Sequence, residues 1–242
     1  MKNGEKMFID TDLLYNEAQK FGVTLDETAL NRFDVYAKML VETNKVMNLT
    51  AIIDPHEIVI KHFIDCLTFF KYVDVSENAK IIDVGTGAGF PSMVLLIARP
   101  DLKITMIDSL KKRLVFLQNV LDELGLNAQI IHARGEDGGR TAELREQFDF
   151  ATARAVANLA VLSELCIPYV KLGGYFVAMK GTDVKEIRNA ENAIKLLGGY
   201  IESVNSFEIN ECGSRNIVKI IKKSQTPTKY PRNSSQISKK PL

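Results

Sequence analysis

Three closely spaced glycines follow a short apolar run in the range 81–91, and they form the strongest candidate for a binding site in this chain. The polar and turn positions of this range are Asp83, Gly85, Gly87 and Gly89, followed by Phe90 and Pro91. The Ile and Val residues favour a buried strand, the glycines let the backbone approach a ligand without interference from Cβ atoms, and a proline suits the start of a helix. A strand, a glycine turn and a helix in this order are typical of the edge of an open α/β sheet that binds a nucleotide-like cofactor.

The spacing of the glycines bears on which cofactor this turn binds. A dinucleotide site has the pattern G-x-G-x-x-G, with the pyrophosphate on the helix N-terminus. Here Gly89 comes one position early, and Phe90 and Pro91 fill the space of the pyrophosphate. The Asp83 carboxylate suits a ligand with a cationic or donor-rich portion. S-adenosylmethionine carries a sulfonium and an amino group and no phosphate, so the pattern favours this cofactor over NAD.

Later strand ends offer further polar groups. Asp108 ends the second predicted strand, where an adenosine ribose needs an acceptor, although Asp108 or Ser109 could instead cap the helix that follows. Gly135 and Glu136 follow the third strand. The backbone of Gly135 could pair with the edge of the adenine, and Glu136 could contact the cofactor or be an ordinary charged residue of a loop. Arg154 ends the fourth strand among small residues. A lone arginine in that place, beside the transferred methyl group, is more typical of a functional residue than of a structural one.

These positions depend on an alternation of strands and helices that begins near residue 80. The predicted strands are 81–84, 103–107, 128–133, 148–153, 175–179, 199–209 and 216–221, with helices at 110–124, 158–170 and 184–197. The alternation predicts a parallel sheet covered on both faces, and the last two strands predict an antiparallel hairpin at its edge. We therefore expect an α/β fold of the class I S-adenosylmethionine-dependent methyltransferase type, Rossmann-like, with a seven-stranded mostly parallel sheet and a small N-terminal helical cap.

The two ends of the chain differ from this central pattern. Apolar residues recur at helical spacing before residue 80, and Asp10 or Thr11, Asp26 and Asp54 can cap three helices there. The basic residues near the C-terminus are Lys222, Lys223, Lys229, Arg232, Lys239 and Lys240, with no Asp or Glu among them. We expect a helical cap over residues 1–75, a methyltransferase domain over 76–223, and a basic, disordered tail over 224–242. The tail is compatible with a solubilising end or with an arm that contacts phosphates.

Composition limits the class of protein. The 242 residues, with 46% hydrophobic and 25% charged residues, fit one large soluble domain or one domain with a small appendage. No apolar run approaches the roughly 20 residues that span a bilayer, and the first residues lack the apolar core of a signal peptide. Cys66, Cys166 and Cys212 form no C-x-x-C pair. We expect a cytoplasmic protein with no metal, no disulfide and no membrane contact.

An ordered set of short motifs resembles one known family over about residues 10–222. The motifs are Asn48-Leu49-Thr50, His62 with Asp65, the turn at 83–91, Asp108-Ser109 with Lys112-Arg113, Arg134-x-Glu136, Arg154-Ala155 and Lys180-Gly181. The set resembles the bacterial 16S rRNA guanine-N7 methyltransferase (RsmG) family, also called glucose-inhibited division protein B. This chain has Ser92 where the family usually has glycine, and its tail after Arg232 departs from that of some relatives.

The resemblance implies an enzyme that transfers a methyl group from S-adenosylmethionine to N7 of a guanine in the 530 loop of 16S rRNA, either naked or in a small-subunit particle. The product of the cofactor would be S-adenosylhomocysteine. The positions that match the family's cofactor contacts are Gly85, Phe90, Gly135, Glu136 and Arg154. By the argument above, the same pocket includes Asp83, Gly87, Gly89, Asp108 and Ser109.

Guanine N7 carries a free lone pair, so this reaction needs alignment of the reactants more than a base. Arg154 and Lys180 lie at strand ends near the active face, where a cation can bind guanine O6 or a phosphate. Asn48 is a candidate for holding the target base, and His62 suits either a substrate role or a core histidine bonded to groups such as Asp65. An NAD-dependent oxidoreductase and a non-enzymatic S-adenosylmethionine-binding module are the alternatives. The sequence leaves the oligomeric state open and is compatible with a monomer.

Overall fold

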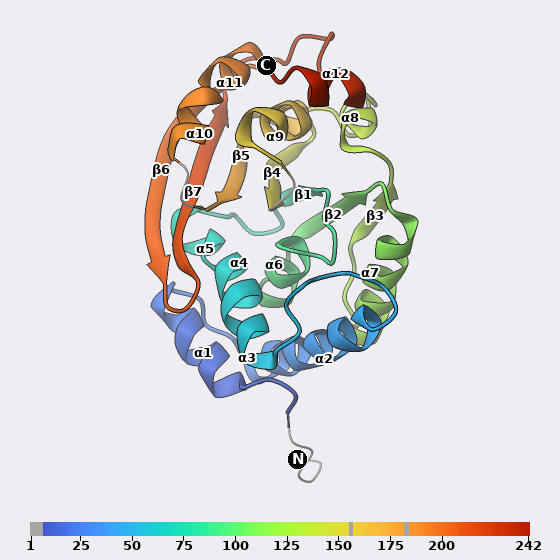
Figure 1. Cartoon of the computed structure of the whole chain (residues 1–242), viewed down its shortest axis with the longest axis vertical. Helices are drawn as coiled ribbons and strands as arrows, with labels where there is room; N and C mark the ends of the chain where they lie inside the picture. The colour runs from blue at the N-terminus through green and yellow to red at the C-terminus, as the bar shows by residue number, and fades with distance from the viewer. Residues whose placement is uncertain (1–6, 155–156, 182–183) are drawn as a thin grey trace.

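A seven-stranded sheet forms the centre of the molecule, and helices cover both of its faces (Figure 1). The structure is a computed structural model that describes residues 7–154, 157–181 and 184–242. The strands are β1 (Lys80–Val84), β2 (Lys103–Asp108), β3 (Gln129–His132), β4 (Phe148–Arg154), β5 (Val170–Lys180), β6 (Gly199–Ile209) and β7 (Gly213–Lys222). They lie in the order β3-β2-β1-β4-β5-β7-β6, and β7 runs opposite to the other strands, so that the pairs β5–β7 and β6–β7 are antiparallel. This mostly parallel sheet with a hairpin at its edge confirms the predicted fold class.

The fifth strand begins earlier than the sequence predicted. Phe148 of β4 pairs with Val170 of β5, whereas Phe150 pairs with Tyr175, so residues 171–174 bulge out of the ladder. Gly173 has a φ of +79°, and a Cβ atom on Gly174 would lie 2.6 Å from the carbonyl oxygen of Asp149. Two glycines in succession allow this bulge. The sequence predicted a helix up to residue 170 and a strand only from residue 175.

The N-terminal helices begin at the predicted caps. They are α1 (Thr11–Lys20), α2 (Glu27–Asn44), α3 (Pro55–Glu57), the π-helical segment η1 (Ile58–Ile64), α4 (Asp65–Leu67) and α5 (Phe69–Tyr72). The side chains of Asp10, Asp26 and Asp54 each accept a hydrogen bond from the backbone N–H three residues further on, at 2.8, 2.7 and 3.0 Å. These bonds satisfy N–H groups that a helix start leaves without partners.

The remaining helices alternate with the strands. They are α6 (Ser92–Ala98), α7 (Lys111–Leu124), α8 (Gly135–Gly138), α9 (Leu159–Cys166), the 3₁₀ turn η2 (Ile167–Tyr169), α10 (Val184–Asn189), α11 (Glu191–Leu196) and α12 (Ser234–Lys239). The single helix predicted over 184–197 is therefore two, divided at Ala190, whose N–H is shared between the carbonyl oxygens of Glu186 and Ile187. No helix in the described ranges is long and apolar enough to cross a bilayer.

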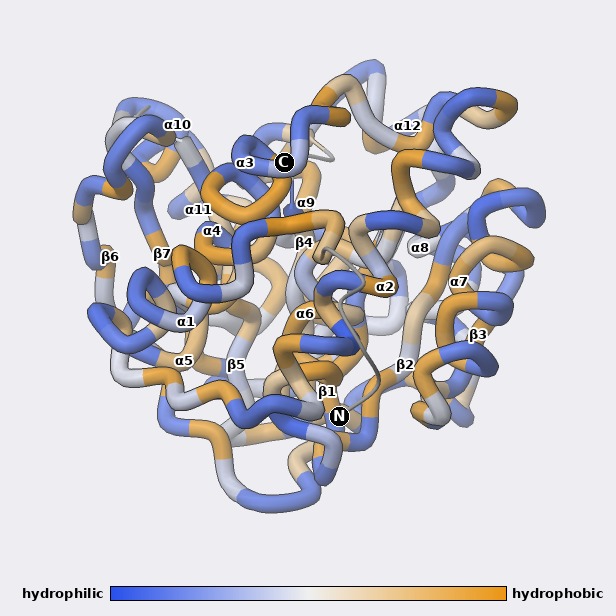
Figure 2. Tube along the Cα trace, turned by 90° about the horizontal axis from the view of Figure 1, so that it is seen from below, coloured by the Kyte–Doolittle hydropathy of each residue, from blue (hydrophilic) through white to orange (hydrophobic). Residues whose placement is uncertain are grey.

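Two apolar cores lie on the two faces of the sheet. Ile81 belongs to the core that contains Phe33 and Phe63 of the N-terminal helices, whereas its neighbour Ile82 belongs to the core of α9 and α11. Alternate residues of a strand point to opposite faces, so a strand buried on both sides is continuously apolar. Figure 2 shows this arrangement as orange segments around α6 and α9 in the middle of the molecule. The N-terminal helices thus share a core with one face of the sheet.

The C-terminal tail is packed, which differs from the disorder that its composition suggested. Tyr230 and Ile237 are buried, and the guanidinium of Arg232 forms an ion pair with Glu164 of α9 at 2.6 Å. Lys222, the first of the basic residues near the C-terminus, is also buried, and burial lowers the pKa of its ammonium to about 8. Composition failed here because these partners lie far away in the sequence.

Backbone carbonyl groups of the tail are fixed by arginines from the segment after α8. Arg145 donates to the carbonyl oxygens of Thr226 and Tyr230 at 2.6 and 2.9 Å, and Arg140 donates to that of Pro231 at 2.8 Å. The tail therefore lies across α8 and α9, and α12 sits close to both helices in Figure 1.

We predict that Arg232→Ala lowers the free energy of unfolding by about 3 kcal/mol, because it leaves the Glu164 carboxylate, which is 1% exposed, buried without its cation. Urea denaturation at pH 7 measures this change. Lys240→Ala removes an exposed charge from the same tail and should alter the stability by less than about 0.5 kcal/mol. Equal stability of the two variants would show that the ion pair does not hold the tail.

Candidate active site

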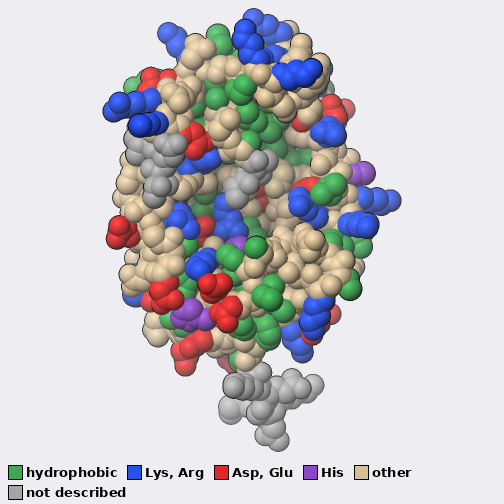
Figure 3. Space-filling model, in the orientation of Figure 1, with side chains coloured by type: hydrophobic (Ala, Val, Ile, Leu, Met, Phe, Trp, Pro, Cys, Tyr) green, Lys and Arg blue, Asp and Glu red, His purple; other side chains and the backbone are tan. Residues whose placement is uncertain are grey.

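A cavity of about 450 Å³ opens at the carboxyl ends of β1, β2 and β4. We call it the cofactor cavity, and its walls include Gly85, Gly87, Phe90, Asp108, Ser109, Gly135, Glu136, Arg154 and His62, together with Leu49, Thr50, Val84, Thr86, Ala88, Ile107, Arg113, Ala133, Arg134 and Leu165. Figure 3 shows a central hollow with Lys and Arg side chains on both sides of it. The position matches the rule that open α/β sheets bind ligands beyond the carboxyl ends of their strands.

The glycine turn forms one wall of this cavity. Gly85 and Gly87 have φ values of +74° and +60°, which other residues rarely adopt. The N–H of Gly87 donates to Asp108 Oδ2 at 3.0 Å, and the hydroxyl of Tyr36 in α2 donates to the carbonyl oxygen of Ala88 at 2.6 Å. A Cβ atom on Gly87 would meet only the carbonyl oxygen of Gly85, at 3.9 Å, so this position is open for a ligand.

Asp83 and Gly89 support the turn from behind and do not line the cavity. The Asp83 side chain is fully buried and accepts hydrogen bonds from Thr86 Oγ1 at 2.7 Å and from the N–H of Ser92 at 3.3 Å. Burial raises the pKa of Asp83 to about 6. A Cβ atom on Gly89 would lie within 3.0 Å of Leu117, Met93 and Tyr36, so this glycine is needed for packing. The other oxygen of Asp83, Oδ1, is buried and has no hydrogen-bond partner among the described residues. The cofactor contacts of Asp83 and Gly89 stay predictions, since neither residue lines the cavity.

Asp108 supports the glycine turn and lines the cavity, but it does not occupy the N-cap position of α7 that the sequence left open for it. Its Oδ2 accepts from Gly87, its Oδ1 accepts from the N–H of Leu110 at 2.8 Å, and its carboxylate also lines the cavity. Leu110, and not Asp108 or Ser109, occupies the N-cap position of α7. Asp108 thus fixes the glycine turn against the start of α7 while it faces the cavity.

The start of α8 forms the opposite wall. A Cβ atom on Gly135 would lie 2.7 Å from Val84, so only glycine lets α8 approach β1 this closely. The Tyr169 hydroxyl donates to the carbonyl oxygen of Gly135 at 2.6 Å. Glu136 is buried in this wall, and its Oε1 has no hydrogen-bond partner among the described residues. A buried acceptor without a protein partner is free to accept a hydrogen bond from a ligand or from water.

Arg154 is held by several groups of the N-terminal helices. It donates to Asp65 Oδ2 at 2.9 Å, to the carbonyl oxygen of Lys61 at 3.2 Å and to His62 Nδ1 at 3.0 Å. Its guanidinium also lies 4.7 Å from the centre of the Phe90 ring. These contacts leave Arg154 in one orientation beside the cavity. Ala155, the other half of its sequence motif, lies outside the described residues.

His62 is bonded to Arg154 and Thr50, and not to Asp65 as the sequence suggested. Because a guanidinium can only donate, Nδ1 of His62 accepts, and the ring therefore carries its proton on Nε2, which lies 2.8 Å from Thr50 Oγ1. The ring stacks on Phe90 with 4.3 Å between centroids. Burial and the charge of Arg154 lower the pKa of His62 to about 3, so the imidazole is neutral at physiological pH.

A second cavity of about 400 Å³ shares the His62 and Arg154 wall. We call it the acceptor cavity, and its other walls include Lys61, Asp65, Lys180, Gly181, Arg215 and Asn216. Lys180 donates to the carbonyl oxygen of Ala157 at 2.9 Å and pairs with Glu186 at 2.8 Å. The two cavities therefore meet at His62 and Arg154, and the second is rich in hydrogen-bond donors.

Asn48 lies apart from both cavities. The side chain of Asn44 accepts from the N–H groups of Leu49 and Thr50 at 2.7 and 3.0 Å, and this turn directs Leu49 and Thr50 to the cofactor cavity while Asn48 is exposed. Thr50 is thus a site residue that sequence reasoning passed over, although it stands in the same motif.

Tyr36 and Arg215 were also missed, and no local pattern marks either of them. Each reaches the site from an element far away in the sequence, α2 for Tyr36 and β7 for Arg215.

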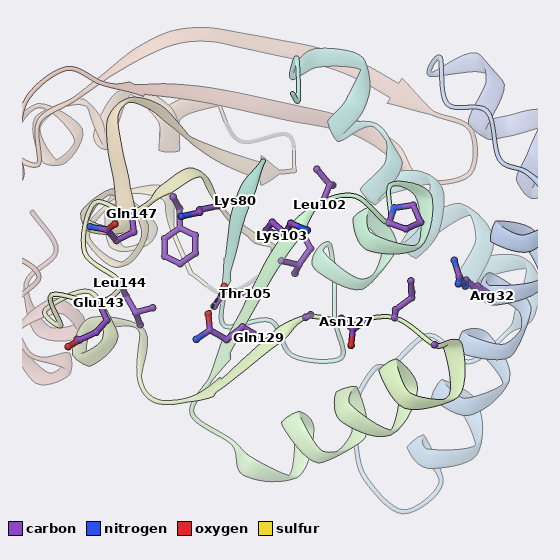
Figure 4. A pocket seen from close by; sticks show the side chains of 16 residues that line it. Arg32, Lys80, Leu102, Lys103, Thr105, Asn127, Gln129, Glu143, Leu144 and Gln147 are labelled. Carbon is purple, nitrogen blue, oxygen red and sulfur yellow. Dashed lines mark hydrogen bonds between the residues drawn. The ribbon is translucent and has the colours of Figure 1, made fainter. Parts of the chain in front are cut away.

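A larger hollow, of about 770 Å³, lies at the other end of the strands (Figure 4). Lys80, Lys103 and Gln129, which begin β1, β2 and β3, line it, and Arg32 reaches it from α2. None of the predicted site residues is part of this wall. Size alone therefore does not locate the active site here.

The chain is similar to proteins of one family. Residues 29–218 match the family model described as "GidB: rRNA small subunit methyltransferase G". A protein of Clostridium beijerinckii named ribosomal RNA small subunit methyltransferase G is 47% identical over 96% of this chain and 98% of its own length. A protein of the same name from Oceanobacillus iheyensis is 47% identical over 91% of this chain and 94% of its own length.

The fold is also similar to that of solved methyltransferases. A SAM-dependent O-methyltransferase from Thermotoga maritima has a TM-score of 0.53 and 17% identity, over 78% of this chain and 72% of that chain. At this identity the likeness concerns the fold, and it agrees with the sheet topology described above.

The buried neutral state of His62 predicts a pH dependence of stability. An unfolded histidine binds a proton below its ordinary pKa of about 6.5, whereas the folded pKa lies near 3, so the unfolded state binds more protons in this window. The contribution of His62 to stability is present above pH 6.5 and is lost as the pH falls towards 3, by about 1.4 kcal/mol per pH unit.

Comparison with His62→Gln isolates this effect, because Asp83 and the other acids titrate in both proteins. Urea denaturation between pH 7.5 and 5 should show the wild-type protein losing stability relative to the variant. A difference that stays constant over this range would contradict a buried neutral histidine.

Proposed function

The chain belongs to the GidB family, rRNA small subunit methyltransferase G, and from this premise we propose that it transfers a methyl group from S-adenosylmethionine to N7 of a guanine in small-subunit rRNA, within the 530 loop of 16S rRNA. The observation that carries the proposal is the pair of adjoining cavities. One has the walls of an adenosyl site, the other has donors for a base, and His62 and Arg154 lie where they meet.

The residues of the cofactor cavity fit S-adenosylmethionine. The Asp108 carboxylate can accept from ribose hydroxyls, and the unpartnered Oε1 of Glu136 can accept from a donor of the cofactor. Gly87 leaves room for the ligand next to the turn. When bound, the cofactor supplies an electrophilic methyl group on a sulfonium.

The protein groups at the junction suit a nucleophile that needs no deprotonation. His62 is neutral, its Nδ1 accepts from Arg154 and its Nε2 faces Thr50, so it is a poor proton acceptor. N7 of guanine attacks with a lone pair that is already free. The task of the site is then to hold N7 in line with the methyl group, which a rigid junction accomplishes by orientation.

The acceptor cavity provides donors for the guanine edge. Besides Arg154, its positive charges are on Lys180, Arg215 and Lys61, and each of these three is also held by an acidic partner. Guanine presents acceptors at O6 and N7 on one edge, so cations near O6 can orient the base. Lys180 is the cation we assign to this contact, with Arg154 fixing the wall behind it.

The other two readings receive less support. The likenesses reported above are to methyltransferases and give no support to an NAD-dependent oxidoreductase. A purely structural use of S-adenosylmethionine would not need the donor-rich cavity beside the cofactor. We further propose that residues 1–75 and 76–223 act together in one site, because Thr50 and His62 come from the first region and Arg154 from the second.

Loss of this protein should abolish one N7-methylguanosine in small-subunit rRNA. Mass mapping or primer extension of 16S rRNA from a deletion strain, and from the strain complemented with the wild-type gene, tests this. The modification should return with the wild-type gene and not with Arg154→Ala. An unchanged N7-methylguanosine signal in the deletion strain would refute the proposed function.

Replacement of Asp108 by alanine should weaken the binding of S-adenosylmethionine by about 1–3 kcal/mol, because an acceptor for the ribose and the support of Gly87 are both lost. Isothermal titration calorimetry measures the affinity. Asp137→Ala is the matched control, since it removes an exposed carboxylate from the neighbouring α8. Equal affinities of the two variants would contradict the ribose role of Asp108.

A further inference from the structure

The start of α7 contains residues that the helix itself does not favour. Leu110 occupies the N-cap position, its side chain is 52% exposed, and it forms no capping hydrogen bond. Serine, threonine, asparagine and aspartate are preferred there, and leucine is among the poorest choices. The first turn then carries Lys111, Lys112 and Arg113 with no acidic residue, so its charges oppose the helix dipole. Local rules broken side by side are expected at functional positions.

These residues border a small hollow beside the cofactor cavity. The hollow has a volume of about 270 Å³, and its walls are Met47 and Asn48 on one side and residues 110–113 on the other. Arg113 also lines the cofactor cavity, as do Leu49 and Thr50, which follow Asn48 in the chain. The hollow therefore adjoins the cofactor cavity at Arg113.

The charges of the hollow are available to a ligand. Lys111 and Lys112 are exposed, and neither forms an ion pair within the described part of the chain. Arg113 lies 3.5 Å from the Asp108 carboxylate. Exposed cations beside the exposed Leu110 and the half-buried Met47 complement a single-stranded nucleic acid, whose phosphates are anionic and whose bases present apolar faces.

We propose that Met47, Leu110 and the 111–113 turn dock the rRNA strand that carries the target guanine, on the far side of the cofactor cavity from the acceptor cavity. This inference rests on the proposed function. A guanine taken into the acceptor cavity leaves its neighbour without a stacking partner, and side chains such as leucine and methionine can contact the exposed base face. The cations then bind the phosphates that flank it. This contact explains why α7 begins with an N-cap leucine and a basic first turn, which lower the stability of the helix.

Two variants and one control separate docking from folding. Leu110→Ser installs a favourable N-cap, and Lys111→Gln/Lys112→Gln removes two charges that oppose the dipole. Lys80→Gln/Lys103→Gln removes two exposed charges at the opposite end of the strands. Methyl transfer is measured on an unmodified 16S rRNA transcript and on small-subunit particles from a deletion strain, at several salt concentrations. Calorimetry gives the S-adenosylmethionine affinity, and thermal denaturation gives Tm.

Both test variants should lower kcat/KM for rRNA about fivefold or more through KM, with an unchanged S-adenosylmethionine affinity and a Tm that does not fall. The lysine double variant should also reduce the slope of log affinity against log salt by about 1.4, which corresponds to two phosphate contacts on a single strand. The control variant should resemble the wild-type protein in every assay.

Other results overturn the inference in distinguishable ways. Test variants that act like the control contradict docking, and the proposed function still stands because the wild-type protein methylates rRNA. A matching loss of cofactor affinity or of Tm would assign these residues to local structure. A defect seen with particles but not with the transcript would indicate a contact with ribosomal protein. If the wild-type protein methylates neither substrate, the proposed function itself fails.

Discussion

The carboxylate of Asp65 joins the three parts of the chain that make the active site. It lies in α4 and accepts from Arg154 at the end of β4 at 2.9 Å and from Arg215 in β7 at 3.0 Å. Through Arg154 it also fixes the ring of His62. A buried ion pair of this kind contributes little net stability but specifies one arrangement, because either partner left alone would be a buried charge. The N-terminal helices are thus positioned on the sheet at the place where the two cavities meet.

The acidic residues at the ends of β1 and β2 differ in their positions: both support the glycine turn, but only the second also lines the cavity. Asp83 is fully buried outside the cavity wall, and its Oδ2 accepts from Thr86 while its Oδ1 has no partner among the described residues. Asp108 is bonded to protein and also lines the cavity. Both carboxylates stabilise the same glycine turn. The turn keeps its φ values of +74° and +60° because Asp108, Thr86 and Tyr36 hold it from three sides. A preorganised turn loses less conformational entropy when a ligand binds.

The sequence predicted the features that depend on local patterns. The alternation of strands and helices gave the sheet, and the spacing from Gly85 to Gly89 located the turn that lines the cavity. The partners of His62 and the packing of Tyr230 could not be predicted, because they depend on contacts between residues far apart in the chain. For the same reason the sequence could show the place of Asp83 at a strand end but not the side to which its carboxylate turns, which here lies outside the cavity wall.

The distribution of charge around the junction follows from the chemistry proposed for it. The cofactor brings a positive sulfonium, and the methylated guanine becomes positive, so an unpaired cation at the junction would oppose both. The structure avoids this, since Arg154 is paired with Asp65 and His62 is neutral, while Lys111 and Lys112 lie outside, in the hollow beside the cofactor cavity. Charges that attract an anionic strand are useful there, at a distance from the sulfonium where solvent screens them. The same positive charge that would hinder the reaction inside the site can therefore assist substrate binding at its rim.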